Sequence, residues 1–361
     1  MTELVKGADL SRLFYTDVVR PIVLDVVGDA HSAAMIDYGS EILGFDDEMS
    51  KDHSWGPRLQ VFLPEDTDKK LFDELDLALR ARLPLEFMGY STSFIIDDEG
   101  VRISSAGNEG QVDHFVLIST LSRFLSRSVG LASIEGMSDG DWLSLPSQKL
   151  LTLSTGPVFH DRVGILSLQS DLQFYPDRVW KYLMACQWMC LSQEEPFIGR
   201  TGMTGDDLGS RIIASRLVQH AIRLAFLIER RYAPYSKWFG TAFRNLSCGE
   251  SLGSKIERVL SASDWQGREK AFVEVTSLLG ELHNDLEITE TVDISARYFH
   301  DRPFQVLGCE RFMLALKSVS SDSKSAKLWG ASPIGGIDTF SDSTDLLEDT
   351  DRRSKIAKLF D

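Results

Sequence analysis

The sequence has few cysteines, and no two of them stand in CxxC spacing. Cys186, Cys190, Cys248 and Cys309 are scattered along the second half of the chain, so we expect free, buried thiols in a reducing compartment. Long apolar stretches are missing too, since no run reaches 18 residues, and the N-terminal stretch MTELVKGADLSRLFY is polar and charged. We therefore expect no signal peptide, no membrane span and a cytoplasmic protein.

Basic residues are in the minority. The chain has 38 Lys and Arg against 54 Asp and Glu, which gives a formal net charge of −16. This charge argues against nucleic acid as a partner, because such surfaces normally need a basic excess, although a local basic groove stays open. HExxH, GxGxxG and P-loop patterns are also absent. Their absence weakens the case for a zinc metalloprotease, a Rossmann domain or a Walker-type NTPase.

The first 170 residues mix helical and strand patterns. Apolar residues recur at three- and four-residue spacing over 8–27 and over 71–83, which predicts helices. Strands are predicted within 31–40, over 58–63, over 112–118 and on both sides of the turn signal DDEG in 86–105. A helix is expected to follow through Phe124, and 150–166 resembles a last strand or hairpin. These patterns predict an α+β domain with a mixed sheet over residues 1–170.

Strand signals nearly vanish after residue 171. Helical patterns cover 175–193, 204–232, 263–286 and 302–319, which predicts an all-helical bundle domain over 171–318. From 319 to 361 the composition shifts to Ser, Asp, Gly and Lys with few large apolar residues. Such a segment has little apolar surface to bury, so we expect an acidic, disordered tail.

A Gly-Ser pair follows the predicted strand at 31–40. A glycine lets the backbone approach a phosphate closely, and the hydroxyl and amides of a following serine can bind its oxygens, although a plain turn is the ordinary alternative. Asp52 follows Ser40 after eleven intervening residues, just before the predicted strand 58–63. Strand, loop and strand would thus bring Gly39, Ser40 and Asp52 together, as phosphoryl transfer with Mg²⁺ requires.

The other carboxylates of a metal site are harder to assign. A second Asp is expected two residues after Asp52, but Ser54 stands there. Asp46, Asp47 and Glu48 of the same acidic loop are possible substitutes, and an ordinary acidic surface loop is the alternative. Asp113, at the start of the strand predicted for 112–118, is the candidate for a third carboxylate on a neighbouring strand, with Asp161 as a competitor.

The helical region adds a basic stripe and a pair of carboxylates. One face of the predicted helix 204–232 carries Arg216, His220, Arg223 and Arg230, and the segment ERRYAPYSKWFG adds Lys237 among aromatic residues. Cations interleaved with aromatics can hold a triphosphate and stack a ring, although a solvated face and core packing explain the same pattern. Glu194 and Glu195 end the first helix of the bundle. Glu195 is our candidate general base for an acceptor hydroxyl.

Six stretches together carry a resemblance. YGSEILGFDDEMSKDHSWGPR, GPVFHD, FYPDRVWKYLMACQW, QEEPFIGRTG, GDDLGSR and ERRYAPYSKWFGTAF look like the DUF4037 domain family, which resembles the nucleotidyltransferase fold of the aminoglycoside and lincosamide nucleotidyltransferases. The resemblance covers roughly residues 8–318. It implies a nucleotidyltransferase-like mixed-sheet domain and a helical bundle that closes over the acceptor.

The motif of that fold is Gly-Ser, about ten residues, Asp-x-Asp and a later third carboxylate. The resemblance matches Gly39 and Ser40 to the Gly-Ser and Asp52 to the first Asp, with His53 as a substitute metal ligand and Asp113 in the third position.

Two functions follow from this assignment. The first is transfer of a nucleoside monophosphate from an NTP to a small-molecule acceptor with Mg²⁺ or Mn²⁺, with Arg216 and Lys237 neutralising the leaving pyrophosphate. The second is a degenerate member of the fold that binds a nucleotide or a partner without turnover, which the absence of Asp at position 54 favours. RNA as the acceptor is a third, weaker alternative.

Overall fold

The chain divides into two compact units in a computed structural model, which describes residues 5–98, 100, 102–107, 111–320, 328–330 and 333–360. Unit 1 comprises residues 1–136 and 149–173, and unit 2 comprises residues 137–148 and 174–361. The main division therefore lies close to the boundary predicted at residue 170. The difference is the short segment 137–148, which belongs to unit 2 although it precedes the last part of unit 1.

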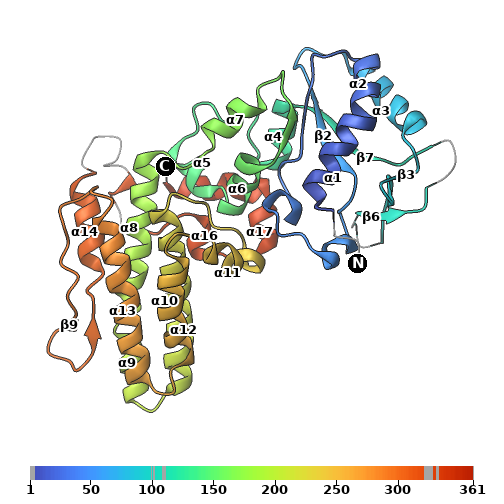
Figure 1. Ribbon diagram of the computed structural model, residues 1–361. Coiled ribbons are helices and arrows are strands. Elements are labelled where there is room, and N and C mark those ends of the chain that lie inside the picture. The colour runs from blue at the N-terminus through green and yellow to red at the C-terminus, as the bar shows by residue number, and fades with distance from the viewer. Residues whose placement is uncertain are drawn as a thin grey trace. The chain divides into compact units, whose positions relative to one another are not determined.

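A four-stranded mixed sheet forms the centre of unit 1 (Figure 1). Its strands are β1 (Ser32–Ala34), β2 (Arg58–Leu63), β7 (Phe115–Thr120) and β8 (Val158–His160), in the order β7-β2-β1-β8. β2 pairs with β7 in parallel, and β1 lies antiparallel to both β2 and β8. The strands predicted within 31–40, over 58–63 and over 112–118 are confirmed.

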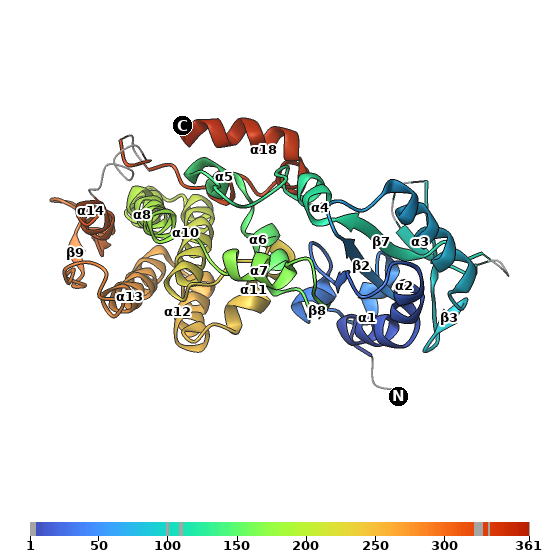
Figure 2. The ribbon, with the colours of Figure 1, turned by 90° about the horizontal axis from the view of Figure 1, so that it is seen from above.

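Helices cover both faces of this sheet (Figure 2). On one face lie α1 (Gly7–Phe14), the π-helical turn η1 (Tyr15–Val19), α2 (Arg20–Val26) and α3 (Lys69–Arg82), which confirm the helices predicted for 8–27 and 71–83. Leu59, Val61 and Leu63 join their apolar core, because alternate residues of β2 point to the same face. On the other face, Phe62 packs edge-on against Phe124 of α4 (Leu121–Ser128), with ring centroids 5.2 Å apart.

The segment predicted as a last strand or hairpin, 150–166, is partly helical. It contains most of α6 (Ser147–Thr155), then β8, and the start of α7 (Ile165–Asp171). Leu150 and Leu153 are both buried at helical spacing, so packing decides a short apolar run that fits either element. The remaining strands of unit 1 form the hairpins β3–β4 (Glu86–Phe87, Tyr90–Ser91) and β5–β6 (Ser93–Ile96, Arg102–Ser105). The last hairpin confirms the strands around DDEG.

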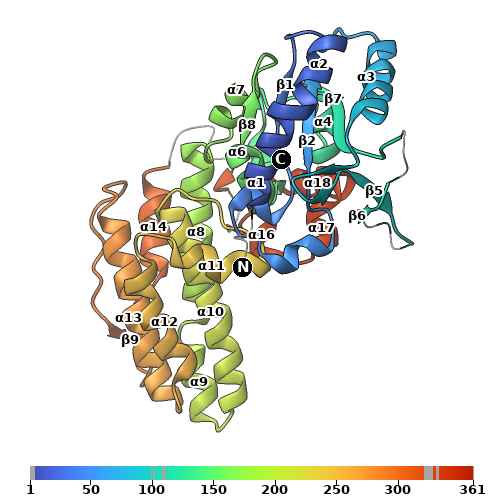
Figure 3. The same cartoon turned by 45° about the vertical axis from the view of Figure 1, so that its right-hand side comes forward.

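Unit 2 is the predicted helical bundle. Its long helices α8 (Asp177–Glu194), α10 (Asp207–Ile228), α12 (Gly249–Ser261) and α13 (Trp265–Asn284) run side by side (Figure 3). The shorter helices are α5 (Asp139–Ser144), α9 (Phe197–Met203), α11 (Ser236–Arg244) and α14 (Glu310–Ser318). A small hairpin, β9 (Arg297–Tyr298) with β10 (Gln305–Val306), interrupts the helical sequence. The fold class is therefore α+β, and none of the described helices is both long and apolar enough to cross a membrane.

The structure corrects the prediction of a disordered tail over 319–361. Its described part contains α16 (Ile337–Phe340), α17 (Thr344–Glu348), α18 (Thr350–Ala357) and the 3-10 turn η4 (Lys358–Phe360). α18 packs against α5 (Figure 2), and the buried Arg353 donates to the Ser144 hydroxyl at 3.0 Å. Ile337 is fully buried. A few well-placed contacts thus order a segment whose composition alone predicts disorder.

Candidate functional site

The Gly-Ser turn of unit 1 follows β1 and has an unusual backbone. Asp37 has φ 87° and Gly39 has φ 121°, both in the region that L side chains rarely adopt. A side chain at Gly39 would also collide with the side chains of Arg58 and Glu41. Glycine is therefore required at position 39 both by the conformation and by the close approach. Ser40 begins the 3-10 turn η2 (Ser40–Leu43) directly afterwards.

A buried ion pair holds the first residue of this turn. Lys149 Nζ lies 2.9 Å from Asp37 Oδ1, and the two side chains are 7% and 15% exposed. The Ser128 hydroxyl donates to the same carboxylate oxygen, and the Thr152 hydroxyl donates to the Asp37 carbonyl. The carboxylate of a residue in a strained conformation is thus fixed from both α4 and α6, which keeps the turn in place.

A second buried ion pair lies on the other side of the turn. Arg58, the first residue of β2, donates through Nε to Glu41 Oε1 at 2.7 Å, and both side chains are at most 3% exposed. Arg58 also donates through Nη2 to the Tyr38 carbonyl at 2.6 Å. The guanidinium therefore joins the start of β2 to the residues on both sides of Gly39 and Ser40. Two carboxylates and two cations flank the turn, and their charges balance.

Hydrogen bonds to Asp46 and Asp47 hold the acidic loop that follows. Asp46 is buried and accepts hydrogen bonds from the Gly7 amide at 2.8 Å and from the Trp55 indole at 3.2 Å. Asp47 caps the 3-10 turn η3 (Glu48–Asp52) by accepting from the amides of Met49 and Ser50. Both carboxylates therefore accept hydrogen bonds from the protein itself, which accounts for them as structural residues.

Asp52 and His53 lie at the solvent-exposed end of η3. Their side chains are 67% and 55% exposed, and His53 Nδ1 is 2.8 Å from Asp52 Oδ1. Ser50, two residues before Asp52, accepts a hydrogen bond of 3.3 Å from the Ser40 hydroxyl. Ser50 of η3 therefore contacts the Gly-Ser turn, whereas the approach of Asp52 itself to Gly39 and Ser40 stays a prediction.

Asp113, the candidate third carboxylate, is paired with a cation instead. It precedes β7, which lies beside β2, but its carboxylate is 2.5 Å from Arg80 Nη1 of α3. Arg80 is bound at the same time by Asp76 at 2.7 Å. Asp161, the competing candidate, accepts from the amides of Gly164 and Ile165 and so caps the start of α7.

These residues do not fit a metal ion in this arrangement. In the part of the chain that the structure describes, no group of three or more His, Cys, Asp or Glu side chains is arranged to hold one. Ser54, in place of a second Asp, has the left-handed φ of 52°, and its amide donates to the Arg102 carbonyl at 2.8 Å. The assignment of Asp52, His53 and Asp113 as ligands of Mg²⁺ stays a prediction, and the geometry does not support it.

Glu195, the candidate general base, is a buried residue of unit 2. Its carboxylate accepts from the amides of Leu307 at 3.0 Å, Gly308 at 3.3 Å and Cys309 at 3.0 Å. Burial raises the pKa of Glu195 to about 7, although these amide hydrogen bonds act to lower it. The carboxylate joins the end of α8 to the segment before α14. This arrangement explains its burial without any catalytic role.

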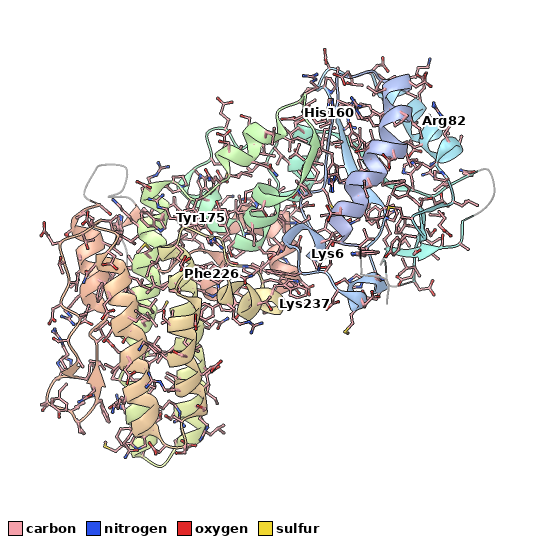
Figure 4. All side chains as sticks on the ribbon, in the orientation of Figure 1. Lys6, Arg82, His160, Tyr175, Phe226 and Lys237 are labelled. Atoms are coloured by element: carbon pink, nitrogen blue, oxygen red, sulfur yellow. The ribbon has the colours of Figure 1, made fainter. Side chains whose placement is uncertain are left out.

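The basic residues of the stripe predicted on 204–232 have partners within unit 2; Arg216, His220 and Arg223 lie on α10, and Arg230 follows its end. Arg216 pairs with Glu194 at 2.8 Å, Arg223 with Asp342 at 2.8 Å, and Arg230 with Asp177 at 2.8 Å. His220 binds Gln187 at 2.9 Å, and burial lowers the pKa of this histidine to about 4. Lys237 of α11 is exposed, and its ammonium group lies 5.1 Å from the Trp238 ring centroid (Figure 4). Arg216 thus has a carboxylate partner inside the bundle, whereas Lys237 faces solvent.

The residues that shape the turn include four that sequence reasoning did not select. Asp37 and Glu41 immediately flank the Gly-Ser segment, so their proximity was readable from the sequence. Arg58 begins β2, at a position where the nucleotidyltransferase motif has no arginine to predict. Lys149 is 112 residues from Asp37 along the chain, and no local pattern connects the two. Only the pairing of β1 with its neighbours and the path of α6 bring them together.

Comparisons with known proteins agree with the resemblance over part of the chain. Residues 142–239 match the model of the family described as "Domain of unknown function (DUF4037)", a segment that runs from α5 into α11. The resemblance to this family is confirmed there. A search of curated proteins found no match. Among solved structures, the chain is similar to a nucleotidyltransferase-like protein from Exiguobacterium sibiricum, with 12% identity and a TM-score of 0.34 over 87% of this chain and 89% of that chain.

Proposed function

We propose that unit 1 binds a phosphate group of a nucleotide at the Gly39–Ser40 turn and does not transfer the nucleotide. The observation that carries the proposal is the turn itself. Its left-handed Gly39 is held between two buried ion pairs, and the neighbouring Ser40 and Ser50 hydroxyls are 3.3 Å apart. A preformed turn with hydroxyl donors binds phosphate oxygens at little conformational cost. The nucleotide part of the proposal rests on the resemblance described above.

The charges around the turn support binding without turnover. Metal-dependent transfer needs several carboxylates that are free to bind Mg²⁺. Here Asp37 and Glu41 are already neutralised by Lys149 and Arg58, and Asp113 is neutralised by Arg80. A divalent cation would have to displace an arginine or a lysine from each of these carboxylates. Binding of a phosphate by hydroxyl and amide groups needs no such exchange.

Transfer of a nucleoside monophosphate to a small-molecule acceptor, with Mg²⁺ or Mn²⁺, is the second candidate. One observation favours it. Asp52 is solvent-exposed at the end of η3, and Ser50 of the same turn contacts Ser40. A triphosphate at the Gly-Ser turn would therefore approach a carboxylate that has no arginine or lysine partner among the described residues.

Calorimetry and a pyrophosphate assay separate the two candidates. The purified full chain is titrated with each of the four NTPs, with Mg²⁺ and again with EDTA, and pyrophosphate release is followed in the presence of a cell metabolite extract. We expect binding of at least one NTP in EDTA, a loss of tenfold or more in affinity in Ser40→Ala, and no pyrophosphate release. Ser126→Ala, which removes a hydroxyl from exposed α4 of the same unit, should leave the affinity unchanged.

Two results would overturn the proposal. If none of the four NTPs binds, the turn is only structural. If pyrophosphate is released with Mg²⁺ or Mn²⁺ and the release disappears in Asp52→Ala, the second candidate is correct and unit 1 is a transferase.

A further inference from the structure

Unit 2 contains a pocket that the proposed function does not use. It is lined by residues of α5, α8 and α10, by the segment 231–233 and by the segment 336–339. Its empty space, with the part open to solvent included, is about 470 Å³. Tyr175 and Phe226, both in its wall, lie in the same part of unit 2 (Figure 4).

One wall of the pocket is aromatic. Tyr175 meets Tyr232 edge-on, with ring centroids 4.9 Å apart at an interplanar angle of 78°, and it meets Trp142 at 6.1 Å and 67°. All three side chains are largely buried, so neighbouring groups hold their positions. Rings at steep angles to one another offer both faces and edges to a further ring, which is the geometry that favours a planar aromatic ligand.

Two arginines, Arg223 and Arg231, also line the pocket. Arg231 is exposed, and its hydrogen bond to the Asn245 carbonyl is long, at 3.5 Å. Within the described residues no carboxylate forms an ion pair with Arg231, in contrast to Arg216 of α10 and to Arg230, the residue before Arg231. Arg223 is only 16% exposed and pairs with Asp342, whose side chain is 63% exposed. One cation at the pocket therefore has its charge available, and the second is held by a carboxylate that faces water.

The C-terminal segment supplies the remaining polar groups. The Asp338 carboxylate accepts a hydrogen bond of 2.8 Å from the Ser147 amide, and the Asp338 carbonyl accepts one from Arg223. Gln187 Nε2 donates to the Thr339 hydroxyl at 3.3 Å. These bonds fasten the segment 336–339 to the pocket as one of its walls. Asp342, three residues after Thr339, is the carboxylate that pairs with Arg223.

We propose that this pocket binds a small planar aromatic molecule that carries one anionic group, a carboxylate or a phosphate. The ring lies against Trp142, Tyr175 and Tyr232, and the anion pairs with Arg231. Asp342 competes for the same region by neutralising Arg223. The site lies wholly within unit 2 and is independent of the Gly-Ser turn of unit 1.

Simple probes test the ligand class. Benzoate and phenyl phosphate combine a ring with the two kinds of anion, whereas benzyl alcohol has the ring without the charge and inorganic phosphate has the charge without the ring. Binding to the full chain is measured by saturation-transfer NMR and calorimetry. We expect benzoate, phenyl phosphate or both to bind at least tenfold more tightly than either control. Their ranking tells which anion the pocket prefers, and their affinity should persist in Ser40→Ala, which separates this site from that of unit 1.

Variants at the two ends of the charge network test the assignment. Arg231→Gln should weaken the better probe tenfold or more, and Asp342→Asn should tighten it severalfold because it releases Arg223. Arg244→Gln removes an exposed arginine of α11 and should change nothing. Far-ultraviolet circular dichroism confirms that each variant is folded. The proposal is overturned if neither probe binds, if benzyl alcohol binds as well as the anions, or if Arg231→Gln and Arg244→Gln weaken binding equally.

Discussion

The carboxylate of Glu195 places two opposing effects in direct competition. Burial inside unit 2 favours its protonated form, whereas three backbone amides that donate to it favour the ionised form. Burial prevails and raises the pKa from its usual 4.5 to about 7. At about 1.4 kcal/mol for each pH unit, this rise corresponds to about 3 kcal/mol of unfolding free energy that depends on pH.

The sign follows from which state holds the proton more tightly. The folded pKa lies above the unfolded one, so the contribution is fully present below pH 4.5 and is lost as the pH rises through about 7. Glu195→Gln cannot ionise, and its amide group adds an offset that is independent of pH. The unfolding free energy of the parent minus that of Glu195→Gln should therefore fall by about 3 kcal/mol between pH 4.5 and 8.

Urea denaturation at a series of pH values measures this difference. Tryptophan fluorescence reports mainly on unit 2, because Trp55 is the tryptophan that belongs to unit 1. Glu281→Gln, which neutralises an exposed carboxylate on α13, controls for the loss of one negative charge. A parent-minus-variant difference that stays constant, or that rises with pH, would refute the reasoning, since a rise means that the amide hydrogen bonds outweigh burial.

Three further predictions concern the turn and the C-terminal segment. Arg58→Met leaves Glu41 buried without its cation and should lower the unfolding free energy by roughly 3–5 kcal/mol in urea denaturation followed by far-ultraviolet circular dichroism; a loss below 1 kcal/mol would mean that the pair contributes little. In Gly39→Ala the alanine must adopt a left-handed conformation, which should lower the free energy of unfolding by about 1–3 kcal/mol and shift the urea midpoint down. An unchanged midpoint would contradict the requirement for glycine. Hydrogen exchange should show protected amides over 350–357, where Arg353 is buried. Exchange at the rate of an unfolded peptide would mean that this segment is disordered, as its composition predicts.

Much of the fold could be predicted from local pattern. The helix at 8–27 and the long bundle helices carry strong periodicity over many residues, and the short apolar run at 58–63 is rich in strand-favouring residues, so packing and propensity agree. The prediction of a strand or hairpin over 150–166 was wrong in part, because its apolar run is too short to distinguish a strand from a helix. The prediction of a disordered tail was wrong because composition averages over a whole segment, whereas Ile337 and Arg353 each fill one buried position.

The candidate site was only partly readable. Gly39 and Ser40 could be selected because a glycine after a strand has a known backbone use, and the contact of Ser40 with Ser50 agrees with the predicted closeness of the acidic loop. The pairing of Asp113 with Arg80 could not be read, because it depends on where α3 lies beside β7. The Asp37–Lys149 pair depends in the same way on distant parts of the chain. Charge balance around a site is a property of the fold, and spacing along the sequence does not contain it.

The most direct test of the central claim is calorimetric titration of the full chain with ATP, GTP, CTP and UTP in EDTA, with Ser40→Ala measured in parallel. The account predicts that at least one nucleotide binds without a divalent cation and that its affinity falls tenfold or more in Ser40→Ala. Binding that appears only with Mg²⁺ or Mn²⁺ and is lost in Asp52→Ala would contradict it.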